Sequence, residues 1–221
     1  MQRDLLDALR CPHPHEEQWL VALVHGANGT RITAADLACP LCQAVFEVRD
    51  GIGDFRHAPP PIPASAEGPA PDATRLAALL GVGDAEGPNG MAPILLAGHE
   101  VSAGAALAER GGCPQLWINP AAGAPRPTPD QLWAILQVSD RLPLGRGTLA
   151  AASLDAAHAR LPALVEAAAM AIRPGGRLVA PAGTAVPSEV RLLASDSMQW
   201  VGDVRTAPGG LVTLRRQSPP A

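Results

Sequence analysis

The sequence predicts an α/β fold whose mostly parallel sheet ends in an antiparallel hairpin, preceded by a small β-rich unit. Three observations carry this prediction. From residue 74 to residue 217, strand-like and helix-like segments alternate, as they do when helices connect parallel strands. Residues 58–73 are rich in proline, alanine and glycine, which is typical of a linker. Three cysteines lie in the first 42 residues, in the company of His13 and His15. We therefore expect two units, 1–57 and 74–217, joined by the linker 58–73.

The composition fits a globular chain and argues against several classes of partner. Of its 221 residues, 47% are hydrophobic, enough for one ordinary domain and a small appended one. The net charge of −4 argues against non-specific nucleic-acid binding and against anionic membranes, which need a positive surface. No apolar run approaches the roughly 20 residues of a membrane span, and the first residues lack the pattern of a signal peptide. We therefore expect a cytoplasmic protein, and the use of arginine without lysine indicates a GC-rich bacterial genome.

In the first unit, the pattern predicts one helical turn followed by strands. The helical turn is expected over Asp4–Arg10, and Asn28-Gly29 is a strong hairpin signal. Strands are expected over Trp19–His25, Thr30–Leu37 and Val45–Arg49. The unit is therefore expected to be β-rich, with its cysteines outside the strands.

The cysteines of this unit have the spacing of a zinc site. Structural zinc takes four tetrahedral Cys and His ligands, usually from two short knuckles. Residues 39–42 form a C-x2-C knuckle, and residues 11–15 (CPHPH) offer either a C-x-H or a C-x3-H pair. In a reducing compartment such a cluster indicates a metal site before it indicates disulfides. The alternative is a ribbon that has lost its metal and is held by its hydrophobic strands.

The residues around the knuckles resemble the small zinc-ribbon activator subunits of tRNA and protein methyltransferases. The matching segments are LLDALRCP, at the first knuckle, and LACPLCQAVFEVRDGIGDF, at the second. Pro14 stands where the family has a further cysteine, so the resemblance implies zinc held by three cysteines and one histidine. We expect His15 rather than His13 in that place, because its longer loop is less strained. The implied ligands are Cys11, His15, Cys39 and Cys42, with His13 as the alternative histidine.

The resemblance also implies the role of the metal and the kind of partner. Four protein ligands leave no open position for a substrate, so the zinc would be structural. The activators pair with a methyltransferase by adding a strand and covering an apolar surface. The ribbon of this chain is therefore expected to pair either with its own α/β unit or with another protein.

The second unit alternates between strands and helices, which predicts a Rossmann-like sheet with helices on both faces. Strands are expected over Pro93–Ala97, Gln115–Asn119, Ala134–Val138, Thr148–Ser153 and Arg177–Ala180. Helices are expected over Thr74–Leu80, over Ala103–Arg110 with Ser102 as its cap, from Thr128-Pro129-Asp130, and over Ala156–Ile172. A closing hairpin is expected from Met198–Arg205 and Leu211–Arg216.

Two segments of this unit resemble class I S-adenosylmethionine-dependent methyltransferases. In AAMAIRPGGRLVAP, residues 168–181, a helix ends in R-P-G-G before a strand. In VSDRLPL, residues 138–144, an acidic residue and L-P precede the fourth strand. The resemblance covers most of residues 76–216 and implies a cofactor site after the first strand. The implied cofactor-binding residues are Gly98, His99, Glu100 and Asn119, with Asp140 near the adenine.

The positions that would face the cofactor depart from the family's pattern. A nucleotide-binding loop needs glycines so that the backbone can approach the ligand, but Gly98 is followed here by His99 and Glu100. Asn119 stands where an acid would hold the ribose hydroxyls, and Leu149-Ala150 replaces the family's F-D pair. Together these departures favour a degenerate site. His99 and Glu100 then belong either to a solvated loop or to a new polar site.

No catalytic residue is predicted. Asp140 and Asp155 fit turn or cap positions, and the chain has no G-x-S-x-G, no phosphate-binding G-x4-G-K and no H-E-x-x-H. We therefore expect a non-catalytic, methyltransferase-like protein with a structural zinc ribbon, acting as a protein-binding or scaffolding subunit. One alternative is an active methyltransferase that binds S-adenosylmethionine with an atypical loop. Another is a different α/β enzyme or small-molecule binder that uses His99 and Glu100.

Overall fold

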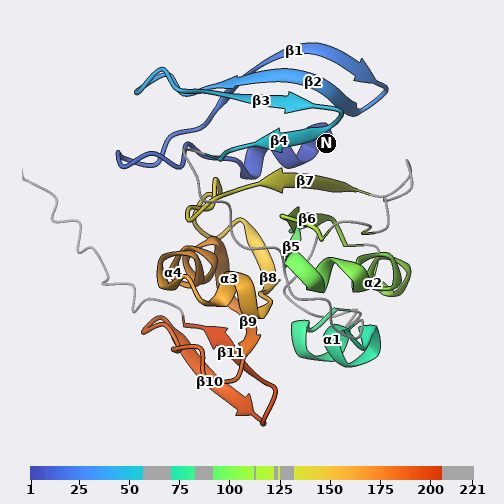
Figure 1. The fold of residues 1–221 in the computed structure, drawn as a ribbon, viewed down its shortest axis with the longest axis vertical. Helices are drawn as coiled ribbons and strands as arrows, with labels where there is room; N and C mark the ends of the chain where they lie inside the picture. Colours follow the sequence, from blue (N-terminus) through green and yellow to red (C-terminus); the bar gives the residue numbers. More distant parts are fainter. Residues whose placement is uncertain (57–70, 83–91, 112, 122–123, 125–131, 206–221) are drawn as a thin grey trace, which may run out of the picture.

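The structure is a computed structural model of the chain, and it describes residues 1–56, 71–82, 92–111, 113–121, 124 and 132–205. The strands of this part form one sheet of eleven strands, in the order β1-β2-β3-β4-β7-β6-β5-β8-β9-β11-β10. Figure 1 shows β1–β3 at one end of the molecule and β10 and β11 at the other. Among the described helices, none combines the length and the apolar character needed to cross a bilayer.

The N-terminal unit, called the ribbon below, is an antiparallel meander above a short helix. Its 3-10 helix is η1 (Arg3–Ala8), and its strands are β1 (Val21–Asn28), β2 (Arg31–Ala38), β3 (Val45–Arg49) and β4 (Ile52–Asp54). The three predicted strands are confirmed. The predicted hairpin is also present, but its two-residue turn is Gly29-Thr30, because Asn28 still pairs with Arg31. The sequence pattern does not predict β4, because three residues after a turn are too short to show an alternation.

The ribbon packs one face of its sheet inward. In β2 and β3, Ile32, Leu37, Phe46 and Val48 are buried, whereas Val45 is exposed. The buried side chains join those of Leu5 and Leu9 and continue into the core of the α/β unit. The ribbon therefore has no separate core of its own.

Strand β4 joins the ribbon to the α/β unit. It runs parallel to β7 (Trp133–Gln137), with Gly53 opposite Leu136 in the register. The Phe55 N–H extends the pairing by donating to the Gln137 carbonyl at 2.8 Å. The two units thus share one hydrogen-bonded sheet instead of being loosely tethered.

The α/β unit contributes the parallel part of the sheet. Its further strands are β5 (Ile94–Ala97), β6 (Gln115–Ile118), β8 (Leu149–Ser153), β9 (Ile172–Pro181), β10 (Val190–Ser195) and β11 (Gln199–Val204). Strands β7, β6, β5, β8 and β9 lie side by side in this order and run parallel to one another. The chain order reverses between β5 and β8, which is the switch point where α/β sheets bind ligands outside the carboxyl ends of the strands. The predicted mostly parallel sheet is confirmed.

Helices cover both faces of this sheet, as expected. They are α1 (Ala73–Leu80), the 3-10 helix η2 (Gly98–Ala103), α2 (Gly104–Gly111), α3 (Ala156–Ala159) and α4 (Pro162–Ala171). Leu76 and Leu80 of α1 and Leu107 of α2 pack on one face. Leu164 and Ala168 of α4 pack on the other face, in the same core as the ribbon.

Two of the predicted helices are wrong in detail. Ser102 does not cap the helix that follows β5, because it lies inside η2 and donates from Oγ to the His99 carbonyl. The predicted helix over 156–172 is two helices, since Pro162 begins α4 and Leu161 before it is extended. The residue before a proline is pushed out of the helical region. The helix expected from 128–130 lies outside the described residues.

The closing hairpin is formed by other residues than predicted. Strand β11 confirms the first expected strand, but it pairs antiparallel with β10 and with β9. The second expected strand, 211–216, lies outside the described residues. Both edges of β11 are paired within the part of the chain that the structure describes, and β10 forms the edge of the sheet.

Candidate functional sites: the cysteine–histidine cluster and the carboxyl edge of the sheet

The first candidate site lies at one end of the ribbon, where two loops meet. The turn after β2 carries Cys39 and Cys42, and it is closed by a hydrogen bond from the Gln43 N–H to the Cys39 carbonyl at 2.9 Å. The other loop begins at Cys11, whose N–H donates to the Gln18 carbonyl at 3.0 Å. Each of these backbone bonds closes its own loop, and the two loops bring the predicted knuckles together.

Four donor atoms converge between the loops. One from each of Cys11, His15, Cys39 and Cys42 lies within 4.8 Å of the others. The Sγ atoms of Cys11 and Cys42 are 3.6 Å apart, and Cys39 Sγ is 3.5 Å from His15 Nε2. A tetrahedral zinc ion with ordinary bond lengths requires about 3.8 Å between two sulfurs and about 3.6 Å between sulfur and nitrogen. The four residues fit a zinc ion, and this cluster could hold one.

The two histidines of the first loop differ in their contacts. His15 Nδ1 lies 2.6 Å from the Glu16 carbonyl oxygen. A proton on Nδ1 then leaves Nε2 as the donor atom toward the cysteines, which is the usual support of a metal-binding histidine. His13 Nδ1 lies 3.4 Å from Cys42 Sγ, but His13 is outside the group of four. The group of four donor atoms therefore includes His15 and not His13.

The thiols of the cluster are electrostatically unequal. Burial raises the pKa of Cys11 to about 12. Burial also acts on Cys39, but hydrogen bonds from the Cys42 and Leu41 backbone and from the neighbouring thiols outweigh it and lower the pKa of Cys39 to about 7. Metal ligands must be thiolates, so the lowered pKa of Cys39 favours the form that binds a metal.

The second candidate site lies at the carboxyl ends of the parallel strands, where the sequence predicts a cofactor loop. Gly98 follows β5 with a φ of 59°, a conformation that glycine adopts without strain. At Gly104 a Cβ atom would lie 2.6 Å from the Trp117 ring, so this glycine allows close packing of helix on strand. His99 and Glu100 begin η2 and are half-buried, so the solvated-loop hypothesis for them is wrong.

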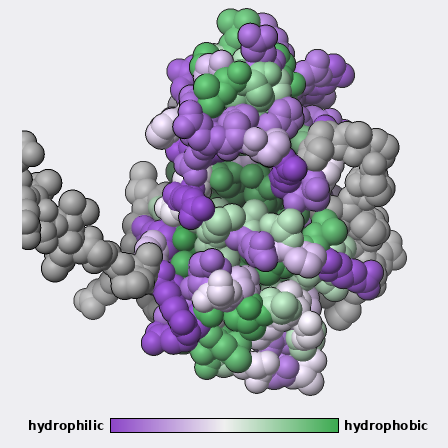
Figure 2. All heavy atoms as spheres, turned by 90° about the vertical axis from the view of Figure 1, so that its left-hand side faces the viewer, coloured by the Kyte–Doolittle hydropathy of each residue, from purple (hydrophilic) through white to green (hydrophobic). Residues whose placement is uncertain are grey.

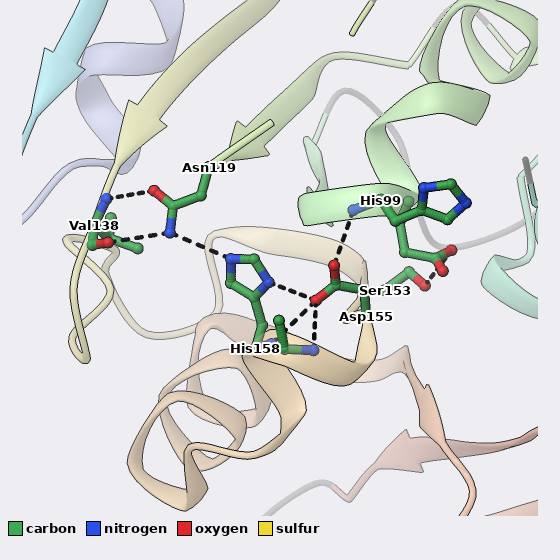
Figure 3. A network of polar contacts seen from close by, with 8 residues as sticks. His99, Asn119, Val138, Ser153, Asp155 and His158 are labelled. Carbon is green, nitrogen blue, oxygen red and sulfur yellow. Dashed lines mark hydrogen bonds and ion pairs between the residues drawn. The ribbon is translucent and has the colours of Figure 1, made fainter. Parts of the chain in front are cut away.

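A network of hydrogen bonds crosses the switch point between β5 and β8 (Figure 3). The carboxylate of Asp155, the first residue before α3, accepts from the His99 N–H through Oδ2 at 2.9 Å. Its Oδ1 lies 2.6 Å from His158 Nδ1 and also accepts from the N–H groups of Ala157 and His158. Asp155 is thus the helix cap that the sequence predicts, and it also bridges the two loops.

Asn119 and His158 extend this network along the edge. The Asn119 amide is paired twice with the backbone of Val138, at 2.8 and 3.0 Å. Its Nδ2 also lies 3.2 Å from His158 Nε2, and Figure 3 shows the imidazole between the asparagine and the aspartate. His158 is 1% exposed. The sequence pattern does not identify His158 as a site residue; its one signal is the i+3 spacing from Asp155.

The remaining predicted cofactor residues are placed differently. Glu100 accepts from Ser153 Oγ at 3.1 Å, and burial raises the pKa of its carboxyl group. Asp140 is exposed in the loop after β7, two residues beyond Val138. The structure therefore brings Gly98, His99, Glu100 and Asn119 to the same edge, where the protein's own groups occupy the hydrogen-bonding positions described above.

A cavity of about 390 Å³ lies at the opposite, amino edge of the parallel strands. It is lined by residues that precede β5, β6, β7 and β8, namely Pro93, Pro114, Leu132 and Thr148, and by Asp4, Leu5, Asp7 and Ala8 of η1. The residues of the hydrogen-bond network do not line it. It is not the site that the fold predicts, because α/β sheets bind ligands at the carboxyl ends.

Comparison with known proteins finds structural likeness only. No family model and no curated protein matches the chain. One match is to a chain in the solved complex of the Haloferax volcanii Trm112 methyltransferase activator with a methyltransferase. It covers 61% of this chain and 90% of the matched chain, at 13% identity and TM-score 0.44. The match to the antibiotic-resistance methyltransferase Kmr covers 65% of this chain and 97% of the Kmr chain, at 14% identity and TM-score 0.39. The match to a geranyl diphosphate methyltransferase in complex with sinefungin covers 49% of this chain and 43% of the methyltransferase chain, at 19% identity and TM-score 0.37.

Proposed function

We propose that this chain is a non-catalytic, methyltransferase-like protein whose ribbon binds a structural zinc ion, and that it serves as a protein-binding or scaffolding subunit. The observation that carries the proposal is the bond between the Asp155 carboxylate and the His99 N–H. In an α/β sheet, the N–H groups of the loop after the first strand are the ones that receive the ligand. Here an internal carboxylate uses that donor, so the chain acts as its own ligand.

The amide of Asn119 supports the same conclusion. A residue at the end of the second parallel strand would have to turn its side chain toward the ribose of a nucleotide cofactor. Asn119 instead donates to the Val138 carbonyl and accepts from the Val138 N–H. A cofactor would have to break these bonds and those of the buried His158, and each polar group left unpaired costs about 1–3 kcal/mol.

The zinc ion would hold the ribbon together and would supply no chemistry. Cys11, His15, Cys39 and Cys42 would supply four ligands to such an ion, which would leave no coordination position for a substrate. They connect the loop after η1 with the turn between β2 and β3. Because the ribbon adds β4 to the edge of β7, a metal that fixes these loops also supports the shared sheet.

A partner protein is the ligand class that this arrangement favours. The net charge of −4 gives no attraction to nucleic acids or anionic membranes. The ribbon exposes large apolar side chains, including Val21, Leu23 and Val45. Exposed apolar patches rimmed by polar residues are typical of protein–protein contact sites.

The experiment that tests this proposal is a calorimetric titration of S-adenosylmethionine into the zinc-loaded chain. We expect no saturable heat at millimolar ligand. The same titration is made on the variant Asp155→Ala, which frees the His99 N–H. Glu109→Ala, on the exposed face of α2, is the control variant. Saturable one-to-one binding to the unmodified chain at micromolar concentration would contradict the proposal.

An active methyltransferase with an atypical loop is the second candidate. It is favoured by the strand order, which puts a switch point between β5 and β8. In that case Gly98, His99, Glu100 and Asn119 would contact the cofactor, with Asp140 near its adenine. This function requires Asp155 to leave the His99 N–H when S-adenosylmethionine binds.

A further inference from the structure

The cavity at the amino edge of the parallel strands lies between the ribbon and the α/β unit. One wall is formed by η1 of the ribbon, and the other by residues that precede β5, β6, β7 and β8. The Gln2 N–H, just before η1, donates to the Trp133 carbonyl at 3.1 Å, and Figure 1 shows the N-terminus beside β4 and β7. Small-molecule sites occur preferentially at such boundaries, and the volume of about 390 Å³ lies within their usual range.

The cavity is separate from the other features described above. Figure 2 shows hydrophobic side chains gathered at the upper end of the molecule, over the ribbon, but exposed residues of that unit such as Val21 and Leu23 do not line the cavity. The members of the cysteine–histidine cluster do not line it either. Neither a zinc ion in the cluster nor a cofactor at the carboxyl edge would therefore occupy it.

The inner part of the cavity is apolar. Leu5 and Ala8 of η1 are 5% and 8% exposed, and Pro93 and Pro114 on the strand side are buried as well. Leu132, before β7, is half-buried and completes this lining. These side chains favour a ligand with an apolar body, because binding removes its apolar surface from water.

The polar groups of three strand-side residues are already used. Pro93 and Pro114 have no N–H, and their carbonyls accept from strand N–H groups at 2.8 and 2.9 Å. The Thr148 hydroxyl donates to the Gly145 carbonyl at 2.8 Å. These groups therefore offer no donor to an anionic ligand.

Two carboxylates stand at the rim of the cavity. Asp4 and Asp7 are exposed, and they are the only charged residues among the described ones that line it. Their i+3 spacing places them on one face of η1, because a 3-10 helix has three residues per turn. In the part of the chain that the structure describes, neither carboxylate has an ion-pair or hydrogen-bond partner. Arg10 donates to the Asp7 carbonyl but forms its ion pair with Glu17.

We propose that this cavity binds a small organic cation, namely an ammonium group carried on an apolar body. The ammonium group lies at the rim and donates to the carboxylates of Asp4 and Asp7. The apolar body lies deeper, between η1 and the residues before the strands. Because the walls come from both units, the bound cation also bridges the ribbon and the α/β unit.

The two parts of the lining select this class of ligand. Carboxylates without a neighbouring donor repel an anion. A metal ion such as Ca²⁺ or Mg²⁺ needs six or more oxygen ligands, several of them from the protein or from ordered water, and the apolar walls supply none. A neutral apolar molecule would gain nothing from the carboxylates. The inference goes beyond the proposed function and holds whether or not the carboxyl edge binds a cofactor.

Three probes that share an apolar body and differ in charge test the proposal: 4-phenylbutylamine, 4-phenylbutanol and 4-phenylbutyrate. Each is titrated at pH 7 into the full zinc-loaded chain, by calorimetry and by NMR of the backbone amides. We expect the amine to bind one-to-one with a dissociation constant of about 0.1–1 mM. The alcohol should bind about twentyfold more weakly, and the carboxylate should not bind. The amides of residues 4–8 and of Thr148 should shift most.

Variants at the rim identify the groups that recognise the charge. Asp4→Asn and Asp7→Asn should each raise the dissociation constant of the amine about fivefold, and both together about twentyfold, without changing that of the alcohol. Glu47→Gln, at an exposed position of β3, removes the same charge away from the cavity and should change neither.

Several outcomes would overturn the proposal. These are no binding of the amine at about 10 mM, equal affinities for the amine and the alcohol, and an unchanged affinity in the double variant. An equal loss of affinity in Glu47→Gln, or amide shifts confined to residues that do not line the cavity, would overturn it as well.

Discussion

The two polar clusters of this molecule differ in what their donor atoms face. In the ribbon, Cys11, Cys39 and Cys42 point their sulfur atoms at one another and at His15. At the carboxyl edge of the sheet, Asp155 and Asn119 instead bond to backbone groups and to His158. Converging thiols leave room for a metal, whereas a network whose members bond one another leaves little for a ligand to bind. In our proposal the first cluster is a metal site, and the second is a polar network that supports the fold.

Removing one thiol should have the largest effect. Cys39→Ser is expected to abolish stoichiometric zinc binding and to unfold the ribbon, since structural zinc contributes about 10–16 kcal/mol of binding free energy at neutral pH. Atomic absorption and a thermal melt measure both effects. Cys113→Ser, in the α/β unit, is the control and should retain the metal. A Cys39→Ser protein that keeps one zinc per chain would contradict the assignment of Cys39 as a zinc ligand.

The two histidines of the first loop sharpen that assignment. His15→Ala should weaken zinc binding strongly, because it removes one of four ligands, whereas His13→Ala should change it little. Competition with a chromophoric chelator gives the two affinities. If the His13 variant loses more affinity than the His15 variant, the coordinating histidine has been assigned to the wrong residue.

At the carboxyl edge, the effect should be on stability and not on ligand binding. His158→Ala removes a buried partner of both Asp155 and Asn119 and should cost about 2–3 kcal/mol of unfolding free energy. That corresponds to a fall in melting temperature of roughly 4–12 °C. His25→Ala, an exposed residue beside Asp36, should stay within about 0.5 kcal/mol. Equal melting temperatures for the two variants would argue against a structural network.

The smallest expected effect is at Glu100. Burial raises the pKa of its carboxyl group, so the folded state holds this proton to higher pH than the unfolded state, and stability falls as pH rises through that range. Glu100→Gln keeps an acceptor for Ser153 and removes the penalty. Its melting temperature should exceed that of the unmodified chain at pH 7–8, and the difference should vanish below the usual range of glutamate. A difference independent of pH would rule out this explanation.

Local patterns predict most of the fold. The alternation in β2 and β3 and the apolar segments of β5 and β6 identify strands directly, because side-chain burial follows the strand period. The spacing of Cys39 and Cys42 likewise identifies the knuckle. What the sequence does not predict is the pairing of β4 with β7, because a three-residue strand has no readable period and its partner lies about 80 positions further on.

The hydrogen-bond network is the other feature that sequence reasoning misses. The departures at His99 and Asn119 indicate that the cofactor loop is altered, but they do not indicate what replaces the ligand. Asp155 and His158, which we propose for that role, follow a different strand and bond to His99 and Asn119 across the sheet. Contacts of this kind depend on tertiary packing and leave only a weak trace in a single sequence.

The most direct test of the comparison is thermal unfolding of the metal-free chain, measured once with zinc and once with S-adenosylmethionine. A ligand present at 100 times its dissociation constant adds about 2.7 kcal/mol of stability, or roughly 5 °C or more in a chain of this size. We predict that one equivalent of zinc raises the melting temperature by at least this amount and that millimolar S-adenosylmethionine leaves it unchanged. A rise with S-adenosylmethionine would show that the carboxyl edge opens to a ligand and would contradict the account.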